Sequence, residues 1–181
     1  MIIGDGIRLR AIDKGDINLS TRWLNDPDVR RYLSFYVPFS KTHEEKWFEN
    51  LSNLPVTEHP LVMEIEQKEE WKPIGVTGFD HVDSRALNAE LGIFIGEKEF
   101  WGQGIGTKAI TLMLDYGFFT LNFHRIYLRV FEENQRGVHC YEKIGFKHEG
   151  RMREAGYLDG KYMDVLWMGI LQDEWREREQ I

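Results

Sequence analysis

The sequence has a single cysteine, Cys140, so it contains no internal disulfide. No apolar run is long enough to span a bilayer. The first five residues also lack the basic start and apolar core of a signal peptide. Together these absences favour a cytoplasmic protein without a membrane partner.

Positive charge is scarce as well. Lys and Arg number 23 against 30 Asp and Glu, which gives a formal net charge of −7 at pH 7. This balance argues against a nucleic-acid partner and is compatible with a cationic substrate, although it also serves solubility. The six histidines show no HExxH pattern or other metal-ligand spacing, so we predict no metal.

The remaining composition is that of one globular domain, predicted over residues 1–181, because no linker, repeat or low-complexity tract interrupts the chain. Alternating or β-branched runs predict strands at residues 7–12, 61–65, 74–79, 90–96 and 125–131. The middle three are joined without helices, which predicts an antiparallel meander. The Asp159-Gly160 pair predicts a hairpin between two further strands.

Helix signals lie between these strands. Asp13 is a good N-cap for a helix that ends near residues 25–27, and a short helix is expected over 28–33. Thr42 and Glu45 have the spacing of a capping box, and the charged residues 66–73 predict a hairpin loop. Asn134 caps a helix that ends at Gly145.

One stretch organises the rest of the chain: the strand at 90–96, a short segment, and the glycine-spaced turn at 101–107. The turn runs into a helix whose apolar face comprises Ile110, Met113, Leu114, Gly117, Phe118 and Leu121. Backbone N–H groups converge in such a turn, and the helix N-terminus adds partial positive charge. The arrangement predicts a site for phosphate or pyrophosphate.

Two common phosphate loops do not fit. A Walker loop ends in Gly-Lys-Ser/Thr, whereas Gly106 is followed by Thr107 and Lys108. A dinucleotide fingerprint needs a third glycine at position 107 and an acidic residue about 20 positions on. The corresponding region, residues 121–124, has no acidic residue.

The turn instead resembles the acyl-CoA-binding motif of the GNAT superfamily of N-acetyltransferases, Arg/Gln-x-x-Gly-x-Gly/Ala. Trp101 departs from its first position and resembles the branch with ribosomal-protein N-terminal acetyltransferases and spermidine acetyltransferases. A second stretch resembles the other GNAT signature, because Asn134 is followed seven residues later by Tyr-Glu-Lys-Ile-Gly-Phe. Gly137 departs from it, since the family often has Ser or Ala there.

The resemblance implies an α/β (α+β) fold of the GNAT type. Its mixed central sheet is expected to have about seven strands, mostly antiparallel, splayed between the fourth and fifth and flanked by about four helices. It also implies acetyl-CoA as co-substrate. The implied cofactor-binding residues are Phe94, Ile95, Gly96, Trp101, Gly102, Gln103, Gly104, Ile105, Gly106, Thr107, Asn134, Arg136 and Lys143.

Catalytic roles also follow from the resemblance. Tyr141 matches the family's general acid for the departing thiolate, the alternative being an ordinary tyrosine of an amphipathic helix. Glu90 is a candidate base acting through water, or else a solvent-facing strand residue. A backbone N–H near Ile95 is expected to polarise the acetyl carbonyl. Phe35 and Tyr36 are candidates for substrate contact, or else core aromatics over the sheet.

The predicted function is enzymatic: acetyl-CoA-dependent transfer of an acetyl group to a primary amine by direct attack in a ternary complex. The Trp-Gly-Gln-Gly loop and the 157–162 hairpin favour a protein N-terminal α-amine as the acceptor. The alternatives are a polyamine or aminoglycoside-type small molecule, and a non-catalytic acetyl-CoA sensor. A sheet edge near Asp159-Gly160 predicts a homodimer.

Overall fold

The computed structural model describes residues 1–178. Its strands are β1 (Ile2–Gly4), β2 (Ile7–Ala11), β3 (Leu61–Gln67), β4 (Glu70–Asp83), β5 (Asn88–Ile95), β6 (Arg125–Phe131), β7 (Lys147–Leu158) and β8 (Lys161–Leu171). Its α-helices are α1 (Ile17–Asn25), α2 (Pro27–Arg30), α3 (Lys41–Asn50), α4 (Ile105–Asp115), α5 (Gln135–Ile144) and α6 (Gln172–Arg178). Shorter helical turns are η1 (Lys14–Asp16), η2 (Leu51–Asn53), η3 (Val56–Glu58), η4 (Lys98–Phe100) and the π-helical η5 (Tyr116–Thr120).

The strands hydrogen-bond in the order β1-β2-β3-β4-β5-β6-β8-β7. The described residues form two compact units, one of residues 1–79 and 93–112 and the other of residues 80–92 and 113–178. Strands β4 and β5 and helix α4 contribute residues to both units.

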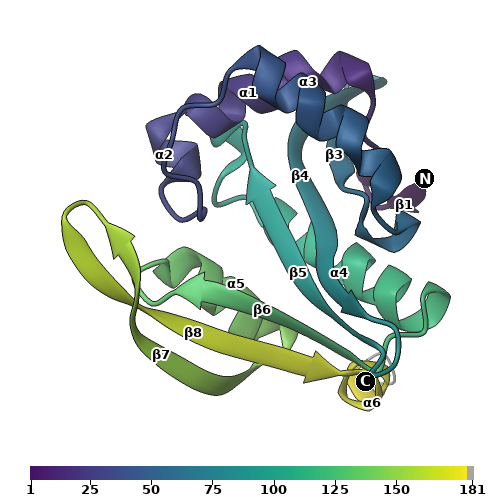
Figure 1. The fold of residues 1–181 in the computed structure, drawn as a ribbon. Coiled ribbons are helices and arrows are strands. Elements are labelled where there is room, and N and C mark those ends of the chain that lie inside the picture. Colours follow the sequence, from purple (N-terminus) through teal and green to yellow (C-terminus); the bar gives the residue numbers. More distant parts are fainter. Residues whose placement is uncertain (179–181) are drawn as a thin grey trace. The chain divides into compact units, whose positions relative to one another are not determined.

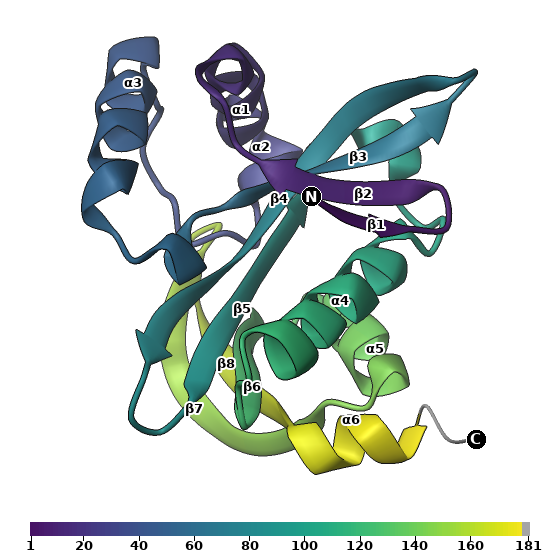
Figure 2. The same ribbon diagram turned by 90° about the vertical axis from the view of Figure 1, so that its right-hand side faces the viewer.

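The first unit is built on antiparallel pairing of β1 with β2, β2 with β3 and β3 with β4. Helices α1 and α3 run side by side in it (Figures 1 and 2). Helix α1 buries Ile17, Trp23 and Leu24 on one face, as the sequence predicts.

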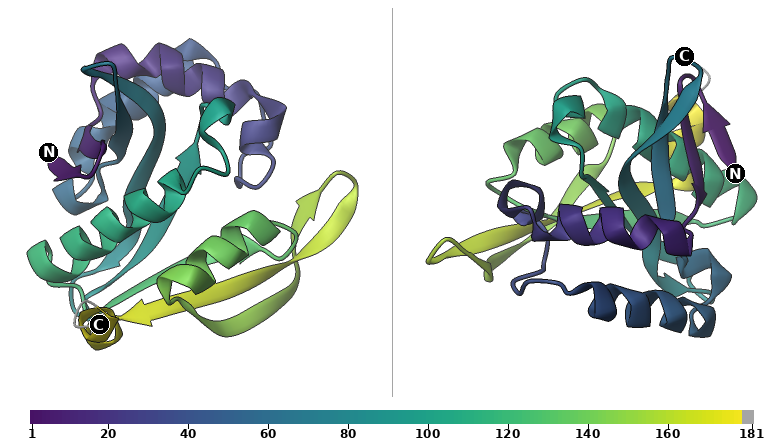
Figure 3. Two further views of the ribbon diagram at one scale, coloured as in Figure 1. Left: turned by 180° about the vertical axis from the view of Figure 1, so that it is seen from behind. Right: turned by 90° about the horizontal axis from the view of Figure 1, so that it is seen from above.

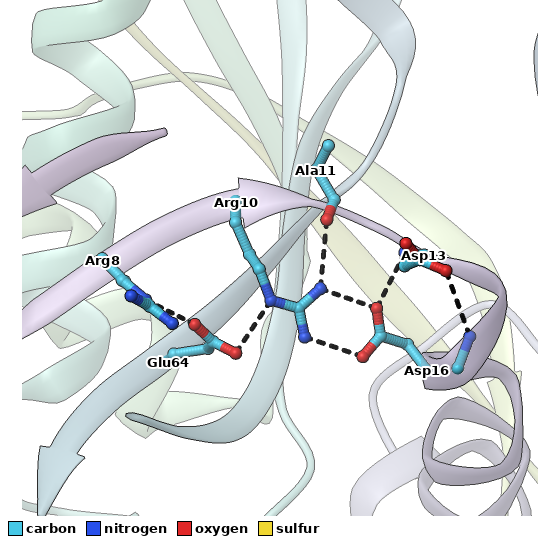
Figure 4. Close-up of polar contacts among 7 residues, drawn as sticks. Arg8, Arg10, Ala11, Asp13, Asp16 and Glu64 are labelled. Carbon is cyan, nitrogen blue, oxygen red and sulfur yellow. Dashed lines mark hydrogen bonds and ion pairs between the residues drawn. The ribbon is translucent and has the colours of Figure 1, made fainter. Parts of the chain in front are cut away.

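An ion network fixes the approach to α1. Arg8 and Arg10 alternate with core residues along β2, and their Nε atoms lie 2.5 and 2.8 Å from the two carboxylate oxygens of Glu64, which is 4% exposed. Arg10 also holds both oxygens of Asp16, at 2.7 and 2.8 Å (Figure 4). These hydrogen bonds raise the pKa of Arg10, so the network remains charged and ties η1 to the sheet.

Two local predictions in this unit are wrong. The N-cap of α3 is Ser40, whose hydroxyl accepts from the backbone N–H of His43 at 3.1 Å, so the predicted capping box at Thr42 starts two residues late. The predicted loop over 66–73 is only a two-residue turn, because β3 extends to Gln67 and β4 begins at Glu70. Polar residues at solvent-facing ends of a hairpin can continue its backbone ladder.

The second unit contains the parallel pairing of β5 with β6 and antiparallel pairing of β6 with β8 and β8 with β7. The β5–β6 register joins Asn88–Glu90 to Arg125–Tyr127. Strand β6 spans the predicted residues and buries Ile126, Leu128 and Val130 on one face.

The predicted hairpin is confirmed. Asp159 and Gly160 have φ values of 49° and 83°, which places both in the left-handed region that a two-residue turn requires. They join β7 to β8 in the long hairpin seen in Figure 3. Most residues of β7, the terminal strand of the sheet order, are exposed.

The fold class is confirmed as a mixed, mostly antiparallel sheet with helices. The described residues contain eight strands and six α-helices, against about seven and about four predicted. Strand β1 and helix α6 are among the elements that the sequence did not predict, because both are too short to give a periodic signal. The predicted helix after the glycine turn extends to Leu121. In the structure, α4 ends at Asp115 and continues as the π-helical turn η5, which ends at Thr120. Among the described helices, none has the length and apolar character needed to cross a membrane.

Candidate functional site

The glycine turn of the first unit contains two residues with a left-handed backbone. Gly102 and Gly104 have φ values of +75° and +76°, and a Cβ atom built on either meets nothing within 4 Å. Both are therefore required by backbone conformation rather than by packing. No protein atom fills the space beside these two residues.

Helix α4 begins where this loop ends. The carbonyl oxygen of Gly104 accepts from the N–H of Lys108 at 3.1 Å, which is the first intrahelical hydrogen bond. The first-turn amides of an α-helix point away from its body and favour negative charge. The predicted residues Ile105, Gly106 and Thr107 supply this first turn, so this part of the loop fits a phosphate group.

The end of β5 is held on two sides within the same unit. The N–H of Gly96 donates to the carbonyl oxygen of Ile74 at 2.8 Å. The indole Nε1 of Trp101 donates to the carbonyl oxygen of Ile95, also at 2.8 Å. Phe94 packs edge-to-face against Trp23, with ring centroids 6.2 Å apart. The predicted cofactor residues of β5 and the glycine loop therefore belong to one connected segment.

Helix α1 is fastened to the segment that follows β5. A Cβ on Gly96 would lie 2.2 Å from the Trp23 ring, so only glycine allows that ring to lie on the backbone there. The Trp23 Nε1 donates to Glu97 at 3.0 Å. Lys98 then binds Asp26 at 2.8 Å and Asp28 at 2.9 Å. The turn between α1 and α2 is thus fixed by ion pairs that the sequence pattern does not reveal.

The aromatic loop before α3 is exposed rather than buried. Phe35 is 45% exposed and Tyr36 is 63% exposed, so neither is a core aromatic over the sheet. Asn25 pins the loop, because its amide donates to the carbonyl of Phe39 at 2.7 Å and accepts from its N–H at 2.9 Å. Phe39 in turn contacts Phe35 edge-to-face at 5.3 Å. Both candidate contact residues therefore present their rings to solvent on an anchored loop.

In the second unit, α5 has both predicted caps. The side chain of Asn134 accepts from the N–H of Gly137 at 3.1 Å, and Gly145 ends the helix with φ 110°. A Cβ on Gly137 would lie 2.7 Å from the Asn134 amide nitrogen. Glycine at position 137, where the family often has Ser or Ala, therefore leaves room for the Asn134 side chain that caps the helix.

Tyr141 lies on α5 with its side chain half-buried and its ring edge-to-face with Phe146 at 5.9 Å. Burial raises the pKa of its phenol above the ordinary value of 10.0, since the phenolate would lose its hydration. The hydroxyl therefore stays protonated at neutral pH and can donate. Arg136 and Lys143, the other predicted residues of α5, are exposed.

Glu90 lies in the second unit and is held by a cation. Arg129 binds both of its carboxylate oxygens, at 2.7 and 3.0 Å, across the β5–β6 pair. Arg129 was not among the predicted residues. Its position four residues after Arg125 on an alternating strand carries no signal of this pairing.

The described residues contain no group of three His, Cys, Asp or Glu side chains that could hold a metal ion. A cavity of about 360 Å³ in the first unit lies away from the predicted site residues. Its lining comes from the end of β2 and the residues after it, from α3 and η2, and from His59 and Pro60.

Comparison with known proteins decides the family. The sequence profile described as the acetyltransferase (GNAT) domain matches residues 7–147. The chain belongs to the GNAT acetyltransferase family. It is thus an acetyl-CoA-dependent N-acetyltransferase acting on an amine.

Several relatives match almost end to end. Spermidine N(1)-acetyltransferase of Vibrio cholerae is 33% identical over 174 residues, covering 96% of this chain and 98% of the relative. The Escherichia coli K12 enzyme of the same name is 30% identical, covering 93% and 88%. A crystal structure of the Vibrio cholerae spermidine N-acetyltransferase in complex with CoA and spermine superposes with a TM-score of 0.86, 32% identity and coverage of 96% and 99%.

A ribosomal relative matches less of the chain. The Bacillus subtilis protein YdaF, whose name proposes a ribosomal N-acetyltransferase, is 32% identical over 101 residues. The match covers 56% of this chain and 55% of that relative.

Proposed function

We propose that this GNAT enzyme transfers the acetyl group of acetyl-CoA to a primary amine of a spermidine-type polyamine. The observation that carries the proposal is the end-to-end similarity to two spermidine N(1)-acetyltransferases, against a partial match to YdaF. The proposal favours the polyamine alternative over the protein N-terminal α-amine that the loop and hairpin motifs favoured.

The chemistry of the chain supports a cationic acceptor. Its net charge of −7 attracts a polycation, since long-range charge raises the local concentration of an oppositely charged substrate. The exposed rings of Phe35 and Tyr36 suit an alkylammonium chain, because aromatic faces attract cations and cover methylene groups. These two residues are therefore proposed acceptor contacts.

The proposed roles in acetyl transfer follow from the chemistry of each residue. The loop at Gly102–Thr107 and the first turn of α4 bind the phosphates of acetyl-CoA, which supplies the activated acetyl group. Phe94–Gly96 bind its extended arm, and the backbone N–H near Ile95 polarises the acetyl carbonyl. Tyr141 donates a proton or hydrogen bond to the departing thiolate. Glu90 accepts the amine proton through water.

The raised pKa of Tyr141 refines its proposed role. An alkyl thiol has a pKa of about 8.5, well below that of a buried phenol. Full proton transfer from Tyr141 to the thiolate is therefore uphill, whereas hydrogen bonding to the developing charge is favourable. We propose that the phenol stabilises the thiolate chiefly as a hydrogen-bond donor.

An acceptor screen tests the proposed function. Purified protein is incubated with acetyl-CoA and one acceptor: spermidine, spermine, an aminoglycoside, or a peptide with a free N-terminus. Thiol release gives the rate, and mass spectrometry of the acceptor locates the acetyl group. We expect kcat/KM for spermidine to exceed that for the peptide by at least about tenfold, or ~1.4 kcal/mol of transition-state discrimination.

A higher kcat/KM with the peptide would overturn the proposal in favour of protein N-terminal acetylation. Binding of acetyl-CoA without release of CoA thiol in the presence of any of these acceptors would instead indicate a sensor. The cytoplasmic location and the single-domain organisation over residues 1–181 stay predictions.

A further inference from the structure

Trp101 is tied to the strand that precedes its loop. Its side chain is half-buried, and its indole Nε1 lies 2.8 Å from the carbonyl oxygen of Ile95, six residues earlier. An indole has one hydrogen-bond donor and no acceptor. Because that donor is used by Ile95, the indole of Trp101 has no second hydrogen-bonding group to offer to a ligand in the loop.

The segment between these two residues is cross-braced. The N–H of Phe100 donates to the carbonyl of Glu97, and the N–H of Trp101 donates to that of Lys98, both at 3.1 Å. The side-chain amide of Gln103 donates to the carbonyl of Glu99 at 2.5 Å. The indole bond closes this set by joining the end of β5 to the first residue of the glycine turn. Segment 95–103 is therefore a short, closed loop with few free torsions.

The other side of the β5 end is fixed too. The carbonyl of Ile74 on β4 accepts from the N–H groups of Gly96 and Glu97, at 2.8 and 3.1 Å. The glycine turn itself carries two positive-φ residues, Gly102 and Gly104, with open space around them. The indole bond therefore joins the turn directly to the strand, in addition to the chain itself and the bonds of η4.

We propose that Trp101 is a positioning residue, whose indole N–H holds the phosphate-binding turn in register with the end of β5. The proposal rests on the proposed binding of acetyl-CoA by both elements. A ligand that binds two elements at once gains affinity when their spacing is already correct, because less conformational entropy is lost on binding. The hydrogen bond between Trp101 and Ile95 should therefore raise the affinity for whole CoA, which binds both elements. It should not change the affinity for a fragment that binds the turn alone.

Two probes separate positioning from direct contact. CoA carries both the pyrophosphate and the extended arm, whereas ADP carries the pyrophosphate without the arm. Trp101→Phe keeps an aromatic ring and removes the donor. We expect this variant to bind CoA about 3- to 10-fold more weakly by calorimetry, as expected for loss of one hydrogen bond, and to bind ADP as the wild type does.

Trp71→Phe is the matched control. Trp71 is a half-buried indole of the same unit whose ring lies under Arg8, outside segment 95–103. It should leave the affinities for both CoA and ADP unchanged. Equal weakening of CoA and ADP by Trp101→Phe would mean that Trp101 contacts the nucleotide directly. Unchanged CoA affinity would mean that the indole bond is packing only, and either result overturns the proposal.

A measurement on the wild type does not depend on the variant folding. The Nε1–H resonance of Trp101 should exchange slowly with solvent both without ligand and with CoA, because its partner is the protein. Fast exchange in the free protein would overturn the proposal. Failure of the acetyl-CoA site itself is distinguishable, because then neither ADP nor CoA would perturb the amide resonances of Gly102–Thr107.

Discussion

Arg129 and Glu90 form a two-point ion pair: the arginine Nε lies 2.7 Å from one carboxylate oxygen and Nη2 lies 3.0 Å from the other. The Glu90 side chain is 13% exposed, and the imidazole of His81 lies 3.8 Å from Oε2. Hydrogen bonding to Glu90 raises the pKa of Arg129, so the guanidinium is charged at every working pH. If Glu90 is the base, at least one of its carboxylate oxygens must accept a proton from water while Arg129 donates hydrogen bonds to both oxygens.

The first prediction concerns this pair. If Glu90 is the base, Glu90→Gln lowers kcat by at least about tenfold, because the amide cannot accept the proton. Arg129→Leu is the matched control: it keeps the carboxylate and removes only the cation that binds both of its oxygens, so kcat should not fall as it does in Glu90→Gln. A Glu90→Gln variant with the wild-type rate would leave Glu90 as the structural partner of Arg129.

The second prediction concerns Gly104. Gly104→Asp places a carboxylate where the turn is proposed to bind phosphate, and should weaken CoA binding by at least about 100-fold, or ~2.8 kcal/mol. Gly6→Asp is the matched control, because Gly6 also has a positive φ and open space around it. The two variants should lose similar stability, about 1 kcal/mol, while only Gly104→Asp loses CoA in calorimetry. Unchanged CoA affinity would contradict the phosphate-loop assignment.

The third prediction concerns Tyr141. Tyr141→Phe removes only the hydroxyl, the proposed hydrogen-bond donor to the departing thiolate, and should lower kcat about 10²- to 10³-fold, with little change in CoA affinity. Because burial raises its pKa above 10.0, the phenol remains protonated below that pH and should contribute no basic limb between pH 6 and 9. Tyr157→Phe, at an exposed tyrosine of the same unit, is the control. Wild-type thiol release by Tyr141→Phe would show that this tyrosine only packs.

The fourth prediction concerns the stability contributed by Glu44. This carboxyl on α3 is 3% exposed, and desolvation raises its pKa above 4.5 although Ser20 donates to it at 3.2 Å. The native state therefore binds more protons than the unfolded chain just above pH 4.5, so stability falls as pH rises through that range. Glu44→Gln should raise the melting temperature at pH 7 and have less effect at pH 4. Glu45→Gln, at the less buried neighbouring position, is the control, and a parallel response of both variants would refute the burial argument.

The fifth prediction is that two copies of the chain associate through the β7–β8 hairpin. The tip exposes Tyr157 and Tyr162, whose rings meet at 5.2 Å. Strand β7 also carries two register irregularities and the exposed charges of Arg151 and Arg153, features that discourage open-edge pairing. We therefore expect tyrosine contacts to dominate, so Tyr162→Ser should reduce the dimer fraction in sedimentation at micromolar concentration. A wild type that sediments only as monomer would exclude this dimer.

Features that depend on neighbouring residues follow from the sequence alone. The Asn134 and Gly145 caps, the Asp159-Gly160 turn and the 125–131 strand are local, because backbone conformation and side-chain period set them within a few residues. The motif spacing of the glycine turn likewise predicted the family that the comparisons confirm.

The side chains that hold these elements in place are known only from the packed fold. The bond from Trp101 to Ile95 forms only because the chain returns toward β5 after η4. The bond from Asn25 to Phe39 joins α1 to an irregular loop. The ion pair of Arg129 with Glu90 joins two strands through residues 39 positions apart. Such partners have no fixed sequence spacing. Each contact exists because folding brings a donor and an acceptor together where water is partly excluded, and that proximity is a property of the packed chain rather than of any local pattern.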